Sequence, residues 1–200
     1  IGMDIKSGPI EVAPTAHHFM WGLKINTDAS TSLKNLFGAG EVCGGVHGAN
    51  RLGGNALADT QVFGKIAGES ASKACKNTEL KTNDEQVNQE ASRIDSLIKK
   101  GSIKPKEFKD NIKNLMWENV AIVREEKTLN EALKQLLEMQ KDLDNLDVGD
   151  NTQYNTDLVT ALEVINMVEI CILIVKSAIL RRESRGAHFR SDLPESIDEW

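Results

Sequence analysis

The sequence lacks the patterns typical of disulfide-rich, nucleic-acid-binding and membrane-bound proteins. Its three cysteines, Cys43, Cys75 and Cys171, are an odd number, lie far apart and include no C-x-x-C pair. Neither a disulfide framework nor a closed zinc site is therefore expected. Lysine and arginine total 24 against 30 aspartate and glutamate residues, a net charge of −6, which argues against a sequence-independent hold on nucleic acid or an anionic membrane. We expect a soluble acidic protein in a reducing, cytoplasmic compartment.

Long apolar runs and targeting signals are also missing. The most apolar stretch, 164–180, is interrupted by Glu169 and Lys176. It falls short of the roughly 18–20 uninterrupted apolar residues that a membrane span needs, so it predicts a buried helix and no transmembrane segment. The first twenty residues show no basic region followed by an apolar one, so no signal peptide is expected. Because the chain starts at Ile1 rather than Met, we expect a piece of a longer protein.

Glycine is scarce in one part of the chain and abundant in the other. Twelve of the fifteen glycines lie in residues 1–76, and only three lie in residues 77–200. Glycine concentrates where the backbone turns sharply or approaches a ligand, whereas a glycine-poor stretch rich in Leu, Lys and Glu favours helices. The predicted class is α+β: a small glycine-rich, strand-containing unit over 1–76, followed by a helical bundle over 77–200.

Local patterns place the elements of both parts. Segments 9–14 and 22–27 are short, alternating and bounded by Pro, Gly or Asn, which indicates strands. Residues 56–67 carry apolar side chains at helical spacing after a glycine-rich loop, with Asn55 as the expected N-cap. The second part shows helical apolar spacing over 87–97, 112–123, 129–146 and 158–180, which predicts a bundle of four helices whose apolar stripes pack on one another.

Three possible chemical sites in the first part are weak. The glycines of 38–44 resemble a dinucleotide-binding fingerprint, but the third glycine comes one residue late and no helix opens there. Cys43 and His47 could form a nucleophile and base, yet no third group to orient them is apparent. His17, His18 and His47 could ligate a metal, but adjacent histidines on a strand point to opposite faces and no acid sits at a suitable spacing. No metal site is expected.

The segment 46–55 carries a stronger signal, because Arg51 and two glycines precede a helix start. The guanidinium of an arginine suits a carboxylate, and the free amides at a helix N-terminus stabilise negative charge. An anionic ligand is therefore expected here. A glycine-rich turn with a solvated arginine is the alternative reading of the same residues.

Five segments together carry a resemblance to a known family. They are PTAHHFM at 14–20, AGEV at 39–42, VHGANRLGGNA at 46–56, LMWENV at 115–120 and ESRGAHFRSDLP at 183–194. In this order they resemble the C-terminal portion of the flavoprotein subunit of fumarate reductase and succinate dehydrogenase, to which L-aspartate oxidase is related. One position departs from the family pattern, because Trp21 stands where the family usually has the first glycine of Met-Gly-Gly.

The resemblance implies an enzyme: an FAD-dependent oxidoreductase that interconverts fumarate and succinate by hydride transfer at flavin N5. Carried over by motif, the substrate-binding residues would be His17, Arg51 and Gly54. The cofactor-binding residues would be His18, Glu41, Asn55, Ala56 and Leu57. The family's proton-donating arginine and its N-terminal FAD-binding portion match nothing here, so no catalytic residue is assigned and the chain alone is expected to be inactive.

The resemblance also implies partners and a location. The expected partners are a C4 dicarboxylate, the N-terminal FAD-binding portion of the same enzyme and an iron–sulfur subunit for electron transport. The expected location is cytoplasmic, including the cytoplasmic face of a membrane complex. Two alternatives stay open: a non-catalytic helical module that docks an iron–sulfur subunit, and a fragment of L-aspartate oxidase. Arg185 and His188 are expected to help pack their loop against the flavin half.

Overall fold

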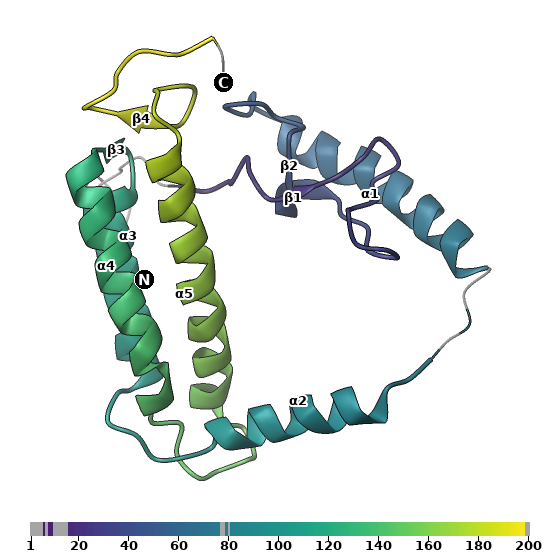
Figure 1. Cartoon of the computed structure of the whole chain (residues 1–200), viewed down its shortest axis with the longest axis vertical. Coiled ribbons are helices and arrows are strands. Elements are labelled where there is room, and N and C mark those ends of the chain that lie inside the picture. The colour runs from purple at the N-terminus through teal and green to yellow at the C-terminus, as the bar shows by residue number, and fades with distance from the viewer. Residues whose placement is uncertain (1–5, 7, 10–15, 77–78, 80, 199–200) are drawn as a thin grey trace. The chain divides into compact units, whose positions relative to one another are not determined.

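The computed structural model describes residues 6, 8–9, 16–76, 79 and 81–198. The chain divides into two compact units, residues 1–78 and 79–200. In the described part, five α-helices and four strands of two residues each make up the regular structure, apart from two short 3-10 helices (Figure 1). The expected class, a small strand-containing part followed by helices, is confirmed.

The first unit holds a short parallel pair of strands and one long helix. Its elements in chain order are β1 (Leu23–Lys24), the 3-10 helix η1 (Gly40–Val42), β2 (Cys43–Gly44) and α1 (Asn55–Cys75). β1 and β2 pair in parallel with Leu23 opposite Cys43. The strand expected over 22–27 therefore forms only at Leu23–Lys24, and most of the segment 9–14 lies outside the described residues.

The start of α1 differs from the sequence prediction by one residue. Gly54, not Asn55, is the N-cap, with a φ of 84° and no side-chain hydrogen bond to the helix. A positive φ of this size costs glycine little and other residues much. The backbone turn therefore falls on Gly54, and Asn55 becomes the first helical residue.

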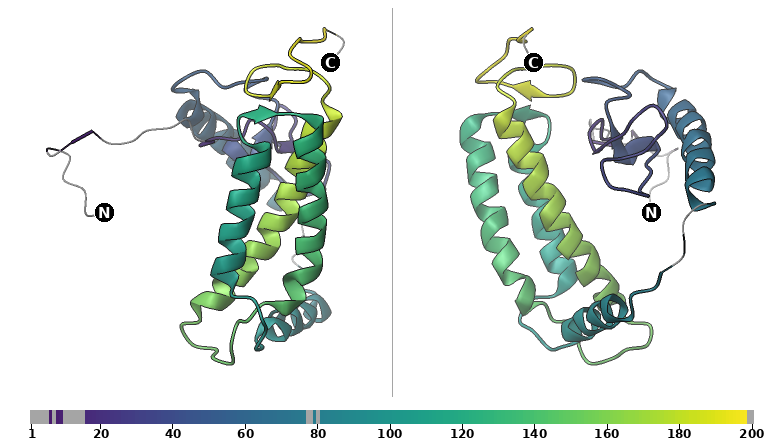
Figure 2. Two further views of the ribbon diagram at one scale, coloured as in Figure 1. Left: turned by 90° about the vertical axis from the view of Figure 1, so that its left-hand side faces the viewer. Right: turned by 45° about the vertical axis from the view of Figure 1, so that its right-hand side comes forward.

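The second unit is helical. Its elements are α2 (Asp84–Leu97), α3 (Pro105–Val120), β3 (Val123–Arg124), α4 (Glu126–Asp142), the 3-10 helix η2 (Leu143–Asn145), α5 (Thr156–Leu180) and β4 (Phe189–Arg190). Asn155 caps α5 by accepting a hydrogen bond from the Leu158 amide at 2.9 Å, and Pro105 opens α3 at a position where a missing N–H costs nothing. Both views of Figure 2 show α3, α4 and α5 lying alongside one another.

The expected bundle of four helices is wrong in one respect, because α2 does not belong to its core. None of the fourteen residues of α2 is buried, and only Ile94 and Leu97 are even half-buried. Most of its positions are polar or charged, so the helix has too narrow an apolar stripe to bury against a neighbour. Asn83 nevertheless caps its first turn by accepting from the amides of Glu85 and Gln86.

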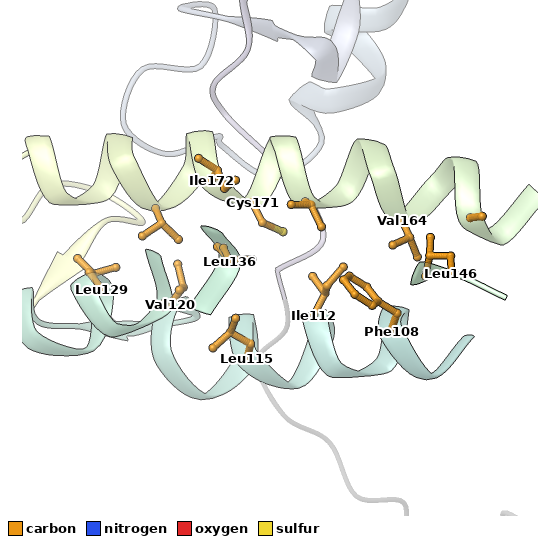
Figure 3. Close-up of a cluster of buried hydrophobic side chains, with 14 of the residues drawn as sticks. Phe108, Ile112, Leu115, Val120, Leu129, Leu136, Leu146, Val164, Cys171 and Ile172 are labelled. Carbon is orange, nitrogen blue, oxygen red and sulfur yellow. The ribbon is translucent and has the colours of Figure 1, made fainter. Parts of the chain in front are cut away.

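The core of the second unit lies between α3, α4 and α5 (Figure 3). Its buried side chains include Phe108, Ile112 and Leu115 of α3, Leu129 and Leu136 of α4, and Val164, Val168, Ile172 and Val175 of α5. By length and composition α5 could span a membrane. In this unit, however, its inner face is buried in the bundle, as predicted for 164–180, while Ile170, Leu173 and Leu180 on its outer face are more than half exposed.

A buried carboxylate organises the loop that follows α5. The Glu183 side chain is fully buried, accepts hydrogen bonds from Arg181 and Arg185, and accepts another from the Ile197 amide at 2.7 Å. The hydrogen bonds from Arg185 and Ile197 lower the pKa of Glu183 from its usual 4.5 to about 2. The glutamate therefore stays ionised and joins both ends of the loop.

A second cluster joins the same loop to the α3–α4 connection. Arg190 is buried and forms a two-point ion pair with Asp192, at 2.7 and 2.6 Å, and Asp192 also accepts from the Glu126 amide. Arg124 Nη1 lies 2.9 Å from His188 Nδ1. Because the guanidinium can only donate, Nδ1 accepts and Nε2 donates to the Arg181 carbonyl at 3.2 Å. His188 is thus held in its neutral form, and burial together with Arg124 lowers its pKa.

We predict that Leu136→Ala destabilises the helical unit far more than Leu137→Ala. Leu136 is fully buried and its neighbour Leu137 is 39% exposed. Truncating a buried leucine removes apolar burial and leaves a cavity, which costs about 2–5 kcal/mol, whereas truncation at the exposed position should cost less than about 1 kcal/mol. Urea unfolding followed by circular dichroism measures both. An equal decrease in the free energy of unfolding for both variants would contradict the observed orientation of α4, in which Leu136 points into the core and Leu137 points to solvent.

We predict that acidification destabilises the second unit in two steps. The pKa of His188 is lowered in the folded state, so its contribution to the free energy of unfolding is complete above about pH 6.5 and is lost as the pH falls below that value. The pKa values of Glu183 and Asp192 are also lowered, so their contributions fade below about pH 4.5 and 3.8. Urea midpoints between pH 7 and 3 should fall accordingly. Glu183→Gln should flatten the acid step, and Glu118→Gln, at an exposed position, should not.

Candidate functional site

His17 and Arg51, the two side chains predicted to hold substrate, are in contact. Arg51 Nη2 lies 2.9 Å from His17 Nε2, and Arg51 Nη1 donates to the Leu52 carbonyl at 3.2 Å. Since arginine only donates, His17 Nε2 accepts and the ring proton sits on Nδ1. Arg51 Nε has no partner within the part of the chain that the structure describes, and both it and His17 Nδ1 can donate to a further acceptor.

His18 and Glu41, both predicted to contact the cofactor, also meet. His18 Nδ1 lies 3.6 Å from Glu41 Oε2, and the other carboxylate oxygen accepts from the Phe19 amide at 2.9 Å. The His18 side chain is 7% exposed. Glu41 therefore links η1 to the segment that precedes β1. Its contact with His18 holds that side chain on the side of the segment that faces η1.

The backbone crossing at Gly22 brings these segments together. A Cβ at Gly22 would lie 2.0 Å from the Val42 carbonyl oxygen, and one at Gly44 would lie 2.9 Å from the Gly22 nitrogen. Only glycine allows such an approach. Trp21, which departs from the family pattern, is not among the described residues with positive φ and is 65% exposed. The backbone at this position therefore does not need the glycine that the family usually has.

The remaining predicted residues open α1. Gly54 and Asn55 are exposed, Ala56 is half-buried and Leu57 is 76% exposed. The helix start shows no side-chain cap hydrogen bond, and the Asn55 amide donates to the Leu52 carbonyl at 3.2 Å. The amides of Ala56 and Leu57 in the first turn are therefore the ones that can serve a further acceptor. These residues follow Arg51 by only three to six positions, so the turn that carries Arg51 leads directly into the helix start.

Buried polar atoms without partners gather in this same region. In the described part of the chain they are His18 Nε2, Arg51 Nε and Asp59 Oδ1. Such atoms are costly in a folded protein unless a ligand or water satisfies them. Two of the three belong to residues predicted from the sequence to bind cofactor or substrate, and their position is consistent with a polar ligand.

Sequence reasoning considered His47 but missed its partner, Asp59. Asp59 is the one buried residue of α1, and its Oδ2 lies 3.2 Å from His47 Nε2. The signal was available, because Asp59 shares the half-buried face of α1 with Ala56, Phe63 and Ile66, where a charge is unexpected. His47 thus has the orienting group that the sequence alone did not reveal for a nucleophile pair.

The nucleophile pair of Cys43 and His47 is nevertheless not supported. Burial and the nearby Asp59 charge raise the pKa of the Cys43 thiol, and a protonated thiol is a poor nucleophile. Among the described residues no group of three His, Cys, Asp or Glu side chains is arranged to hold a metal ion. His17 and His18 instead face different partners, Arg51 and Glu41.

The first unit thus combines a parallel strand pair, an uncapped helix start, two adjacent histidines and a half-buried arginine. A family model described as the fumarate reductase flavoprotein C-terminal region matches residues 109–200, and an FAD-binding domain model matches residues 1–57. The chain belongs to the fumarate reductase/succinate dehydrogenase flavoprotein family and matches its C-terminal portion.

Relatives cover the whole chain. It is 48% identical to a subunit of the CoM/CoB fumarate reductase of Methanothermobacter marburgensis, over 100% of this chain and 37% of that one. It is 33% identical to the fumarate reductase flavoprotein subunit of Haemophilus influenzae, over 98% of this chain and 34% of that one. The Mycobacterium smegmatis Sdh1 complex in its apo form superposes with a TM-score of 0.92 at 32% identity, over 99% of this chain and 34% of that one. The chain thus spans about a third of the length of these relatives.

We predict that Gly22→Ala destabilises the first unit, whereas Gly64→Ala stabilises it. The added methyl group at Gly22 would strike the Val42 carbonyl, and the backbone shift should cost on the order of 1–3 kcal/mol. Gly64 lies inside α1, and no atom lies within 4 Å of the position that a Cβ would take. Alanine there should raise the free energy of unfolding by about 0.5–1 kcal/mol, because it has a higher helix propensity than glycine. Melting temperatures of the two variants measure this. A neutral Gly22→Ala would show that β1 and β2 do not approach as described.

Proposed function

We propose that this chain supplies part of the substrate and flavin sites of an FAD-dependent oxidoreductase that interconverts fumarate and succinate. The observation that carries the proposal is the contact between Arg51 and His17, which places two donors side by side in a chain of this family. Support also comes from the relative at 48% identity, which is named as a fumarate reductase. When bound, FAD supplies the hydride chemistry at N5.

Arg51 and His17 bind the dicarboxylate in this proposal. Arg51 Nε is buried and has no partner among the described residues, and His17 Nδ1 is left to donate because Nε2 faces Arg51. A carboxylate accepts well from two such donors, and charge-assisted hydrogen bonds are among the stronger ones in proteins. The Gly54 backbone lies close in sequence and, without a side chain, permits a near approach.

The FAD is held by His18, Glu41 and the start of α1 in this proposal. His18 Nε2 is buried without a partner among the described residues, and Glu41 is already anchored by the Phe19 amide. Asn55 begins α1, and its amide donates to the Leu52 carbonyl at 3.2 Å, whereas the following amides of Ala56 and Leu57 have no side-chain cap and favour negative charge. These groups can orient a polar cofactor, and the rest of its site is expected in the N-terminal portion found in the relatives.

No residue of this chain is proposed as the proton donor, so the chain alone is expected to lack activity. The names of the relatives from Methanothermobacter marburgensis and Haemophilus influenzae describe both proteins as subunits of larger enzymes. We accordingly propose that the partner is an iron–sulfur subunit, and that the location is cytoplasmic, including the cytoplasmic face of a membrane complex. Bound FAD in the purified full-length protein would separate this proposal from a non-catalytic docking module. Turnover of fumarate or succinate, but not of aspartate, would separate it from L-aspartate oxidase.

We predict that Arg51→Lys in the full-length enzyme lowers kcat/KM for the dicarboxylate at least about tenfold. Lysine keeps the charge but lacks the planar fork of donors, and losing a charge-assisted hydrogen bond costs about 1.5–3 kcal/mol. If the Arg51–carboxylate interaction is stronger in the transition state than in the bound substrate, kcat also falls. If the interaction is equally strong in both, only KM rises. Steady-state kinetics with fumarate and succinate measure the split.

The control for this prediction is Arg93→Lys. Arg93 lies on α2, far along the chain, and makes an exposed ion pair with Glu90. Its replacement should leave kinetics and flavin content unchanged. FAD content should also stay near normal in Arg51→Lys, because Glu41 and the α1 amides hold the cofactor. Unchanged dicarboxylate turnover, or loss of flavin before loss of turnover, would refute the substrate-site assignment.

A further inference from the structure

Asp59 is an unusual residue for the place that it occupies. It lies in the second turn of α1, is 6% exposed, and is the one buried residue of that helix. Its Oδ2 contacts His47 Nε2 at 3.2 Å, with side-chain exposures of 3% and 7%, and its Oδ1 has no partner among the described residues. A buried carboxylate that uses half of its hydrogen-bonding capacity contributes little net stability. Its place in the fold therefore calls for another explanation.

His47 lies in the turn that carries Arg51 from β2 to α1. This turn includes Gly45, Gly48 and Gly54, all with positive φ. Glycines at such positions make the turn possible but leave its backbone free to move in the absence of other contacts. The His47–Asp59 contact joins two positions twelve residues apart, and Arg51 lies between them. The contact thus closes a loop that contains Arg51.

The same imidazole touches the predicted cofactor residues. The rings of His47 and His18 meet edge to face, with centroids 5.5 Å apart, and His18 contacts Glu41. Since the Asp59 carboxylate can only accept, His47 Nε2 donates to it, and the orientation of the His47 ring is set from α1. The Asp59 carboxylate on α1 therefore sets the angle at which the His47 ring meets the His18 ring.

We propose that His47 and Asp59 are a positioning pair that holds the turn 45–54 on α1, and so sets Arg51 against His17 for dicarboxylate binding. The inference rests on the proposed function, because it assigns the pair a role in that same site. Neither residue touches substrate or takes part in the proton and hydride steps. A shift of about 1 Å in a binding group can cost as much as a hundredfold in rate, so loosening this turn should be visible in kinetics.

The test uses the full-length flavoprotein with its FAD. Asp59→Ala should lower kcat/KM for the dicarboxylate about tenfold or more, mainly through KM, with FAD content near normal. Asp59→Asn should recover much of the loss, because its amide oxygen accepts the same hydrogen bond from His47 Nε2. The Kd of succinate, read from the change in flavin absorbance, should rise in parallel. Glu69→Gln, at an exposed position of the same helix, is the matched control and should change nothing.

A second variant separates positioning from folding. The double variant His47→Leu with Asp59→Leu removes the buried charge and fills the space with apolar groups, a change that is often neutral or stabilising. Its melting temperature should stay within a few degrees of the parent, while its succinate Kd stays raised. A purely structural role predicts normal kinetics in this folded double variant.

Each outcome has a distinct meaning. Normal kcat/KM in folded, flavin-loaded Asp59→Ala, with a clear loss in Arg51→Lys, would overturn this inference and leave the proposed function standing. Loss of FAD with an unchanged succinate Kd in the loaded fraction would also overturn it, because the pair would then hold cofactor instead. Arg51→Lys with normal turnover would remove the proposed function itself.

Discussion

The candidate site depends on the parallel pairing of β1 with β2. These strands are only two residues long, yet their register sets Leu23 opposite Cys43 and Lys24 opposite Gly44. The pairing requires the backbones to approach so closely at Gly22 that no side chain fits there. As a result, the segment carrying His17 and His18 runs beside the segment that carries Glu41 and leads to Arg51. Contacts between residues 34 positions apart, such as His17 with Arg51, follow from this one crossing.

The second unit depends on a different interaction, the burial of one face of α5. Val164, Val168 and Val175 are fully buried between α3 and α4. The loop beyond α5 is then held by charge rather than by apolar packing. Glu183 and Arg190 are both buried, and each is satisfied by opposite charges and backbone groups. Such clusters fix the path of a loop that has few apolar side chains, and they make its stability depend on pH.

Buried charges have unlike surroundings in the two units. In the loop after α5, Glu183 is met by two arginines and a backbone amide. In the first unit, Asp59 is met by a single imidazole, and His18 and Arg51 each keep a buried nitrogen without a partner among the described residues. Full satisfaction is typical of a structural cluster, whereas partial satisfaction is typical of a binding site. The contrast supports placing ligand chemistry in the first unit.

The sequence by itself determined the local features of this protein. Periodicity predicted α3, α4 and α5 and the buried face of 164–180, because apolar spacing is set by helix geometry. The family motifs predicted the groups that the structure brings together in pairs, His17 with Arg51 and His18 with Glu41. Tertiary structure alone decided that α2 stays outside the core and that Asp59 meets His47. These outcomes depend on which surfaces pack against one another. The type and spacing of residues along the chain do not identify which distant residue each of them will contact.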